Sequence, residues 1–198
     1  MTAAPPASLP RIRKAARIEG HTLVLRNAQV ADAAFIHALR TDPVRARHLS
    51  AVPAALAAQI AWLERYAGDE TQAYFIVCDA ASGEPLGTVR LYNARGDSFS
   101  WGSWLLRTGL PARCAIESAL MVYHYARALG FDRAHFEVRQ DNTSVWRFHE
   151  NFGAMRVACR DQQFFYQLAP AALAAALQRW RRYLPHGVRV LQQPPTGD

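Results

Sequence analysis

The stretch that decides the fold is FSWGSWLLRTGLPARCAIESALMVYHYARALGFDRAHFEV, residues 99–138. Its first part, 99–106, is rich in aromatic and leucine side chains and predicts a strand. Apolar side chains recur at helical spacing through 114–129, and Gly130 follows where a helix C-cap glycine belongs. Residues 134–138 predict a second strand. A strand, a helix and a strand in this order require a parallel pair with a right-handed crossover.

The residues before this unit predict an antiparallel meander. Strands at 74–78 and 86–92 are joined by a turn at 81–84, and a turn at 95–97 leads into the strand at 99–106. Short turns between β-rich runs connect antiparallel neighbours. The other elements expected before the meander are a strand at 21–26 and helices at 31–41 and 53–67.

Further elements follow the unit. We expect a short helix at 145–151, strands at 155–159 and 164–168, and a helix from 170 to about 183. The fold class is therefore α/β: a single domain with a mixed sheet, built from an antiparallel meander and one parallel βαβ unit, with helices on both faces.

The composition indicates one sizeable core. The chain has 198 residues, of which 51% are apolar and 20% are charged, and this length favours one domain with appendages. We divide it into a flexible basic leader at 1–18, a domain at 19–168, and a C-terminal helix and tail at 169–198. No apolar run reaches the roughly 20 residues of a membrane helix, and no apolar segment follows the basic leader as in a signal peptide. We expect a cytoplasmic protein.

The net charge of +7 is concentrated near the ends of the chain. Residues 1–18 carry +4 and residues 169–198 carry +3, whereas 19–168 holds 15 basic and 15 acidic side chains. Nucleic acid is therefore not an expected partner, although basic flanks can dock an anion. Cys78, Cys114 and Cys159 form neither a CxxC pair nor a zinc spacing, so we expect reduced, mostly buried thiols and no metal.

Two segments of the unit carry residues suited to chemistry. The loop RTGLPAR at 107–113 precedes the long helix, and the free amides of a helix start favour phosphate. Arg107 and Arg113 add bidentate positive charge there. After the second strand come Asn142, which is either a helix cap or a ligand contact, and His149, which is either a structural partner or a proton donor.

Three motifs, taken together, resemble the GCN5-related N-acetyltransferase (GNAT) superfamily over residues 22–168. CAIESAL at 114–120 with the following YA at 125–126 is similar to the family's GxAxEAL…YA helix. VRQDNTS at 138–144 is similar to VxxxNxxS, and FHENFGA at 148–154 is similar to LYEKxGF, with His149 at the tyrosine position. Within the superfamily, this sequence most resembles the ribosomal-protein N-acetyltransferase-like branch and the amino-sugar acetyltransferases of polysaccharide pathways.

The resemblance implies acetyl transfer from acetyl-CoA to a primary amine. The strand before the long helix would bind the pantetheine arm through its backbone, the helix start would bind the pyrophosphate, and Asn142 would contact the pantetheine arm or an ordered water. His149 would protonate the leaving thiolate. The implied cofactor-binding residues are Leu105, Leu106, Arg107, Leu110, Arg113, Cys114, Ala115, Asn142 and Trp146.

The pyrophosphate loop departs from the family pattern, which is usually Arg/Gln-x-x-Gly-x-Gly/Ala. This chain reads LPARCA at 110–115 and keeps only the last small residue, Ala115. Pro111 removes one amide donor, and Arg113 stands where a glycine is usual. We interpret Arg113, with Arg107, as a side-chain substitute for the lost backbone contacts.

The general base and the acceptor are less defined. Asp97 and Glu137 are the candidate bases, because an attacking amine must first lose a proton. Tyr92, Phe99 and Trp101, with Trp104 beside them, form either sheet packing or a stacking surface for an acceptor.

Three functions stay open at this point. Together with the resemblance, the aromatic residues favour a small-molecule amine, in particular a nucleotide-linked amino sugar. The alternatives are a protein N-terminal amine and a non-catalytic binding module that uses the basic flanks; a homodimer is also left open.

Overall fold

The computed structural model describes residues 9–43 and 55–192. The predicted start of the second helix at 53 and parts of both chain ends lie outside these residues. The strands are β1 (Ala15–Glu19), β2 (Leu23–Asn27), β3 (Ala73–Asp79), β4 (Pro85–Arg95), β5 (Ser98–Leu106), β6 (Arg133–Arg139), β7 (Met155–Arg160), β8 (Gln163–Leu168) and β9 (Arg189–Gln192). The helices are α1 (Ala33–Thr41), α3 (Leu56–Gly68), α4 (Ala112–Ala128), α5 (Thr143–Asn151) and α6 (Pro170–Trp180), with 3₁₀ turns η1 (Val30–Asp32) and η2 (Arg181–Tyr183).

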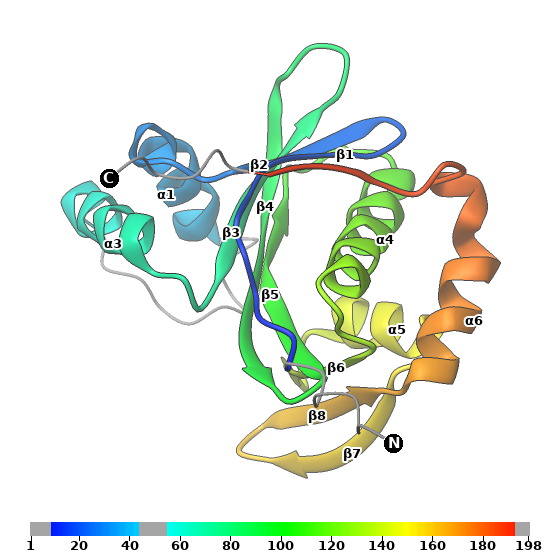
Figure 1. Ribbon diagram of the computed structural model, residues 1–198. Helices are drawn as coiled ribbons and strands as arrows, with labels where there is room; N and C mark the ends of the chain where they lie inside the picture. Colours follow the sequence, from blue (N-terminus) through cyan, green and yellow to red (C-terminus); the bar gives the residue numbers. More distant parts are fainter. Residues whose placement is uncertain (1–8, 44–54, 193–198) are drawn as a thin grey trace, which may run out of the picture.

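These strands form one mixed sheet in the order β7-β8-β6-β5-β4-β3-β2-β1-β9. The β5–β6 pair is parallel, and the other paired strands run antiparallel. Figure 1 shows α1 and α3 on one face and α4, α5 and α6 on the other. The predicted α/β fold, a meander followed by one parallel βαβ unit, is confirmed.

Helix α4 is the centre of the larger core. Its residues from Glu117 to Tyr123 are all buried, because the helix lies between the sheet and the C-terminal segment. Leu129 caps it, and Gly130 then takes a positive φ of 97° that side chains with a Cβ rarely adopt. The predicted glycine stop is confirmed.

Glu117 ties α4 to the turn between β1 and β2. Its carboxylate is 1% exposed and accepts hydrogen bonds from the backbone amides of His21, Thr22 and Leu23 at 2.7, 2.6 and 2.9 Å, and from the Thr22 hydroxyl at 2.6 Å. A buried carboxylate needs such donors. This residue of the family-like helix therefore has a structural role.

The segment predicted as a flexible leader, 1–18, includes part of a strand. Residues 15–19 form β1, which pairs with β2 on one side and with β9 on the other. Ile12, Ala15 and Ile18 are buried, and this apolar pattern was hidden in the sequence by the arginines between them. Strand β9, at 189–192, was not predicted, because three of its four residues are exposed and give no alternation.

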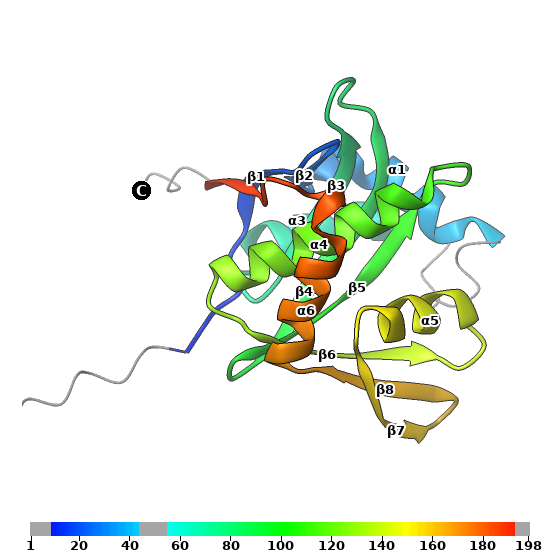
Figure 2. The same ribbon diagram turned by 90° about the vertical axis from the view of Figure 1, so that its right-hand side faces the viewer.

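The C-terminal helix belongs to the same core as the rest of the domain. Leu173, Ala176 and Leu177 of α6 are buried in the cluster that contains α4, and Figure 2 shows α6 crossing α4. The boundary predicted at residue 168 is thus not a boundary between separate cores.

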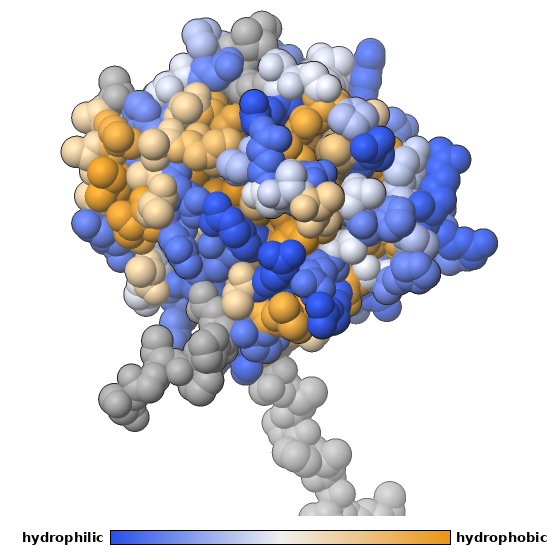
Figure 3. Space-filling view, turned by 90° about the horizontal axis from the view of Figure 1, so that it is seen from above, coloured by the Kyte–Doolittle hydropathy of each residue, from blue (hydrophilic) through white to orange (hydrophobic). Residues whose placement is uncertain are grey.

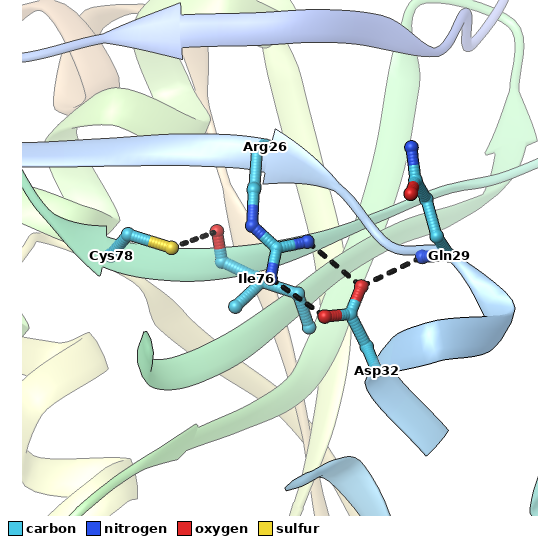
Figure 4. A network of polar contacts seen from close by, with 5 residues as sticks. All are labelled: Arg26, Gln29, Asp32, Ile76 and Cys78. Carbon is cyan, nitrogen blue, oxygen red and sulfur yellow. Dashed lines mark hydrogen bonds and ion pairs between the residues drawn. The ribbon is translucent and has the colours of Figure 1, made fainter. Parts of the chain in front are cut away.

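A second, smaller core lies under α1 and α3. At its edge, Arg26 of β2 donates two hydrogen bonds to the Asp32 carboxylate at 2.8 and 2.6 Å, and the Gln29 amide donates a third at 2.8 Å (Figure 4). Asp32 is 8% exposed. The network connects the end of β2 to the start of α1.

The surface and the helices give two further observations. On the face seen in Figure 3, hydrophobic residues form several groups between hydrophilic ones. Among residues 9–43 and 55–192, no helix has the length and apolar character to cross a bilayer, and no three His, Cys, Asp or Glu side chains converge as a metal site would require.

Candidate active site

The sheet opens between its two parallel strands. β5 and β6 pair only at Ser98–Arg133 and Phe99–Ala134. Beyond these pairs the strands diverge, and a cleft of about 560 Å³ lies there. Residues of α1, α3, β3, β4, β5, β6, α5 and β8 line this cleft.

A β-bulge shapes the β5 wall of the cleft. The β4–β5 register shifts between Thr88–Leu105 and Arg90–Gly102, and Ser103 has a positive φ of 46°. The Thr88 hydroxyl donates to the Ser103 carbonyl oxygen at 2.7 Å. Gly102 meets Tyr92, whose hydroxyl would lie 3.0 Å from a Cβ at this position. The bulge therefore turns a stretch of β5 backbone out of the ladder at the cleft wall.

Aromatic rings surround His149 in the cleft. The imidazole centroid lies 4.2 Å from Phe136 and 5.1 Å from Trp101, and the side chain is 5% exposed. Burial lowers the pKa of His149 to about 3. Its Nδ1 has no hydrogen-bond partner among the described residues. The ring is therefore neutral near pH 7, and its Nδ1 can still form a hydrogen bond with a ligand.

Four of the described arginines line the cleft. Arg40, Arg65 and Arg90 line it together with Arg139, whereas Glu137 is the one carboxylate among the described lining residues. Arg139 is paired with Asp141 at 3.1 Å. No ion pair within the described ranges involves the other three arginines. The cleft therefore favours an anion.

Five predicted site residues meet in the cleft: Tyr92, Trp101, Glu137, Asn142 and His149. Asn142 occupies the N-cap position of α5, yet its side chain makes no capping hydrogen bond. Its Oδ1 accepts a long hydrogen bond from the Ser144 hydroxyl at 3.4 Å, and the side-chain amide still has donors to offer a ligand. Trp104, noted beside the predicted acceptor residues, also lines the cleft.

Two predicted residues lie elsewhere. Asp97 is not among the cleft residues: it is exposed and pairs with the Arg133 guanidinium at 3.0 Å. Phe99 is 0% exposed and packs against Phe131 at 5.5 Å, because the residue lies where β5 is still paired with β6. The structure thus gives Asp97 no access to the cleft and gives Phe99 no contact surface for an acceptor.

The residues predicted to hold the cofactor lie mainly around the start of α4. Pro111 is the N-cap, no side chain caps the helix, and no acidic residue lies in its first turn. Arg113 and Ala115 lie within that first turn. The Cys114 amide already donates to the Pro111 carbonyl at 2.9 Å. The remaining first-turn amides and the Arg113 guanidinium are suited to an anion.

The other predicted cofactor residues lie outside the cleft and make contacts within the protein. Leu105 and Leu106 are still paired with β4, whereas Ser103 and Trp104 line the cleft. Arg107 forms an ion pair with Glu84. Trp146 donates from its indole nitrogen to the Gln140 carbonyl at 3.2 Å, and it does not line the cleft. Leu110 packs against the main core.

Sequence reasoning missed a second set of cleft residues, which come from α1, α3, β3 and β4: Arg40, Trp62, Tyr74 and Arg90. They are spread over 51 positions of the chain, so no local motif connects them. The signal that could have pointed to one of them is Arg90 itself, a charged residue between the buried Val89 and Leu91 of a predicted strand.

The α/β fold and its cleft are those of an enzyme whose class the comparison with known families gives: an acyltransferase. The profile of the family described as "Acetyltransferase (GNAT) domain" matches residues 22–155, and the chain belongs to the GNAT family.

Solved structures agree with this assignment. The chain is similar to apo FdhC, a nucleotide-linked sugar GNAT, with 31% identity and a TM-score of 0.76 over 85% of this chain and 98% of that one. A probable GNAT acetyltransferase from Chromobacterium violaceum has a TM-score of 0.75 at 18% identity, covering 88% and 96% of the two chains. One from Brucella melitensis has a TM-score of 0.74 at 19% identity, covering 89% of each chain. The curated proteins gave no significant match.

Proposed function

We propose that this protein transfers the acetyl group of acetyl-CoA to the primary amine of a nucleotide-linked amino sugar. The observation that carries the proposal is the cleft at the β5–β6 opening, which is lined by four arginines and by several aromatic rings. The similarity to FdhC, whose description names a nucleotide-linked sugar, supports the choice of acceptor.

The acetyl donor would enter from the start of α4. Its diphosphate would lie on the first-turn amides with Arg113, and its pantetheine arm would follow the β5 bulge toward Asn142. This arrangement would bring the thioester close to His149. Arg107 is already paired with Glu84, so its contribution to cofactor binding would be smaller.

The reaction needs a free amine, a polarised carbonyl and a proton for the sulfur. The amine nitrogen attacks the thioester carbon, the C–N bond forms, and the C–S bond breaks to release CoA. Glu137, which is exposed in the cleft, would take the amine proton directly or through water. His149 is neutral at pH 7 because burial lowers its pKa to about 3. We therefore assign it as a hydrogen-bond donor to the departing thiolate rather than as an imidazolium acid. The proton that Glu137 takes from the amine returns through water to the thiolate, so that CoA leaves as the thiol.

The test follows free CoA with a thiol reagent over a panel of amino sugars, their nucleotide-linked forms and peptides with free N-termini. We expect CoA release with the nucleotide-linked amino sugars. His149→Phe should lower kcat by about 100-fold, while the Kd for acetyl-CoA measured by calorimetry changes little. Unchanged kcat in the variant would remove His149 from the mechanism.

The alternative functions give different results in the same panel. Release of CoA with peptides alone would identify a protein N-terminal acetyltransferase. No release with any amine, combined with salt-sensitive binding of an anionic polymer, would identify a binding module that uses the basic flanks.

A further inference from the structure

Buried polar atoms without a hydrogen-bond partner concentrate in the cleft. Among the described residues, five side-chain nitrogen or oxygen atoms are buried and unpartnered, and four of them belong to residues that line the cleft. One is the His149 Nδ1 already described. The other three are Arg40 Nε, Tyr74 Oη and Arg90 Nε. Leaving such a group unpaired is unfavourable, and more so for a charged group, so a ligand would supply the hydrogen bonds that the protein does not.

These three groups act on one another electrostatically. Burial raises the pKa of the Tyr74 hydroxyl, whereas the nearby Thr88 hydroxyl, Arg40 and Arg90 act in the opposite direction. Burial is also the main cause that lowers the pKa of Arg90, and the charge of Arg40 adds to it. Two guanidinium groups therefore lie within electrostatic range of each other, and no ion pair within the described ranges compensates either one.

The Arg90 side chain is held in place by aromatic rings. Its guanidinium carbon lies 4.5 Å from the Tyr92 ring centroid and 5.8 Å from that of Trp62, and its Nη1 donates to Gln72 at 3.2 Å. Trp62 is itself stacked on Tyr66 at 5.6 Å. A guanidinium positioned in this way loses little conformational entropy when it binds a ligand.

We propose that Arg40, Tyr74 and Arg90 form a phosphoryl-binding site for the acceptor. The inference rests on the proposed function and adds to it the part of the acceptor that the enzyme recognises. The acceptor would place its amine toward Trp101 and His149 and its phosphoryl group toward α1 and β4. Three donors from three different elements suit a phosphoryl group, which offers more acceptor oxygens than a carboxylate does.

This site is separate from the proposed binding site for the diphosphate of acetyl-CoA. The diphosphate site is at the start of α4, which covers one face of the sheet, whereas Arg40 belongs to α1 on the opposite face (Figure 1). The molecule would therefore bind two anions at once, one from each substrate.

Acceptor kinetics test the proposal. The full-length enzyme is assayed with an amino sugar, its 1-phosphate and its nucleoside-diphosphate form at saturating acetyl-CoA. We expect kcat/KM to be at least about tenfold higher for the phosphorylated acceptors. Arg40→Gln should raise their KM at least about tenfold and change kcat/KM of the free amino sugar by less than about threefold. Arg179→Gln removes the same charge from an exposed position of α6 and should behave as wild type.

Equilibrium binding provides a readout that does not need turnover. Uridine and thymidine diphosphate are titrated by calorimetry into enzyme saturated with CoA, so that the α4 site is filled. Arg40→Gln and Arg90→Gln should each weaken diphosphate binding at least about tenfold, with circular dichroism showing that the variants fold.

The outcomes separate the two proposals. Equal use of free and phosphorylated amino sugars, a KM increase common to both in Arg40→Gln, or a preference for amines that carry a carboxylate would overturn the phosphoryl site and leave acetyl transfer standing. No CoA release with any amine, while the arginine variants still lose diphosphate binding, would contradict the acetyl transfer and support the anion site.

Discussion

At the scale of single residues, Glu117 has the clearest energetic role. Its buried carboxylate accepts hydrogen bonds from three backbone amides and one hydroxyl. Ala at this position would leave those amides without that hydrogen-bond acceptor. We expect Glu117→Ala to lower the free energy of unfolding by about 3 kcal/mol or more, measured by urea denaturation. Glu117→Gln keeps one acceptor oxygen and should lose less. Glu64→Ala, at an exposed position of α3, is the control and should change stability by less than about 0.5 kcal/mol.

His149 makes the stability of the fold depend on pH. The pKa of this imidazole is about 3 in the folded protein because of burial, against about 6.5 when unfolded. Below pH 6.5 the unfolded chain therefore binds a proton that the folded chain does not, and stability falls as the pH drops from 6.5 toward 3. Between pH 7.5 and 5.0 the loss from this residue is roughly 2 kcal/mol.

His149→Phe isolates that contribution. The Phe ring has no titratable group and suits the aromatic surroundings, so the unfolding free energy of the variant should depend less on pH than that of wild type. Denaturation curves at pH 7.5 and 5.0 measure the difference. Parallel pH dependence in the two proteins would mean that the ring is not buried in its neutral form.

At the scale of elements, α6 contributes to the main core although it lies beyond the last family-like motif. Leu173 is 1% exposed, and Leu173→Ala should lower the unfolding free energy by about 2–4 kcal/mol. Leu56→Ala in α3 removes the same atoms from a residue that is 40% exposed and should cost much less. Similar losses in the two variants would show that α6 is not packed as described.

The helices and central strands were predictable, because each carries its own periodic pattern. α4 has an apolar face at helical spacing and a glycine stop, and β3 is a continuous buried run. β1 and β9 were not predictable in this way. They are edge elements in which arginines interrupt short apolar patterns, and only their pairing with each other and with β2 makes them strands.

At the scale of the whole molecule, the cleft follows from where the parallel pair ends. Two residue pairs hold β5 to β6, and the strands then diverge, so that side chains from both faces of the sheet reach a common space. His149 comes from α5 on one face and Arg40 from α1 on the other (Figure 1). The same opening would therefore let donor and acceptor meet from opposite sides.

The amino-acid sequence by itself determined the order and kind of most elements and the parallel unit at 99–138, and it pointed to Asn142 and His149 as candidate site residues. The elements follow from local spacing, since periodicity and caps depend on near neighbours in the chain, whereas the two candidate site residues follow from the resemblance to a known family. Only the tertiary structure decided that Asp97 and Phe99 lie outside the cleft and that Arg40, Tyr74 and Arg90 lie inside it. Burial and convergence depend on how distant segments pack, and no local pattern encodes that.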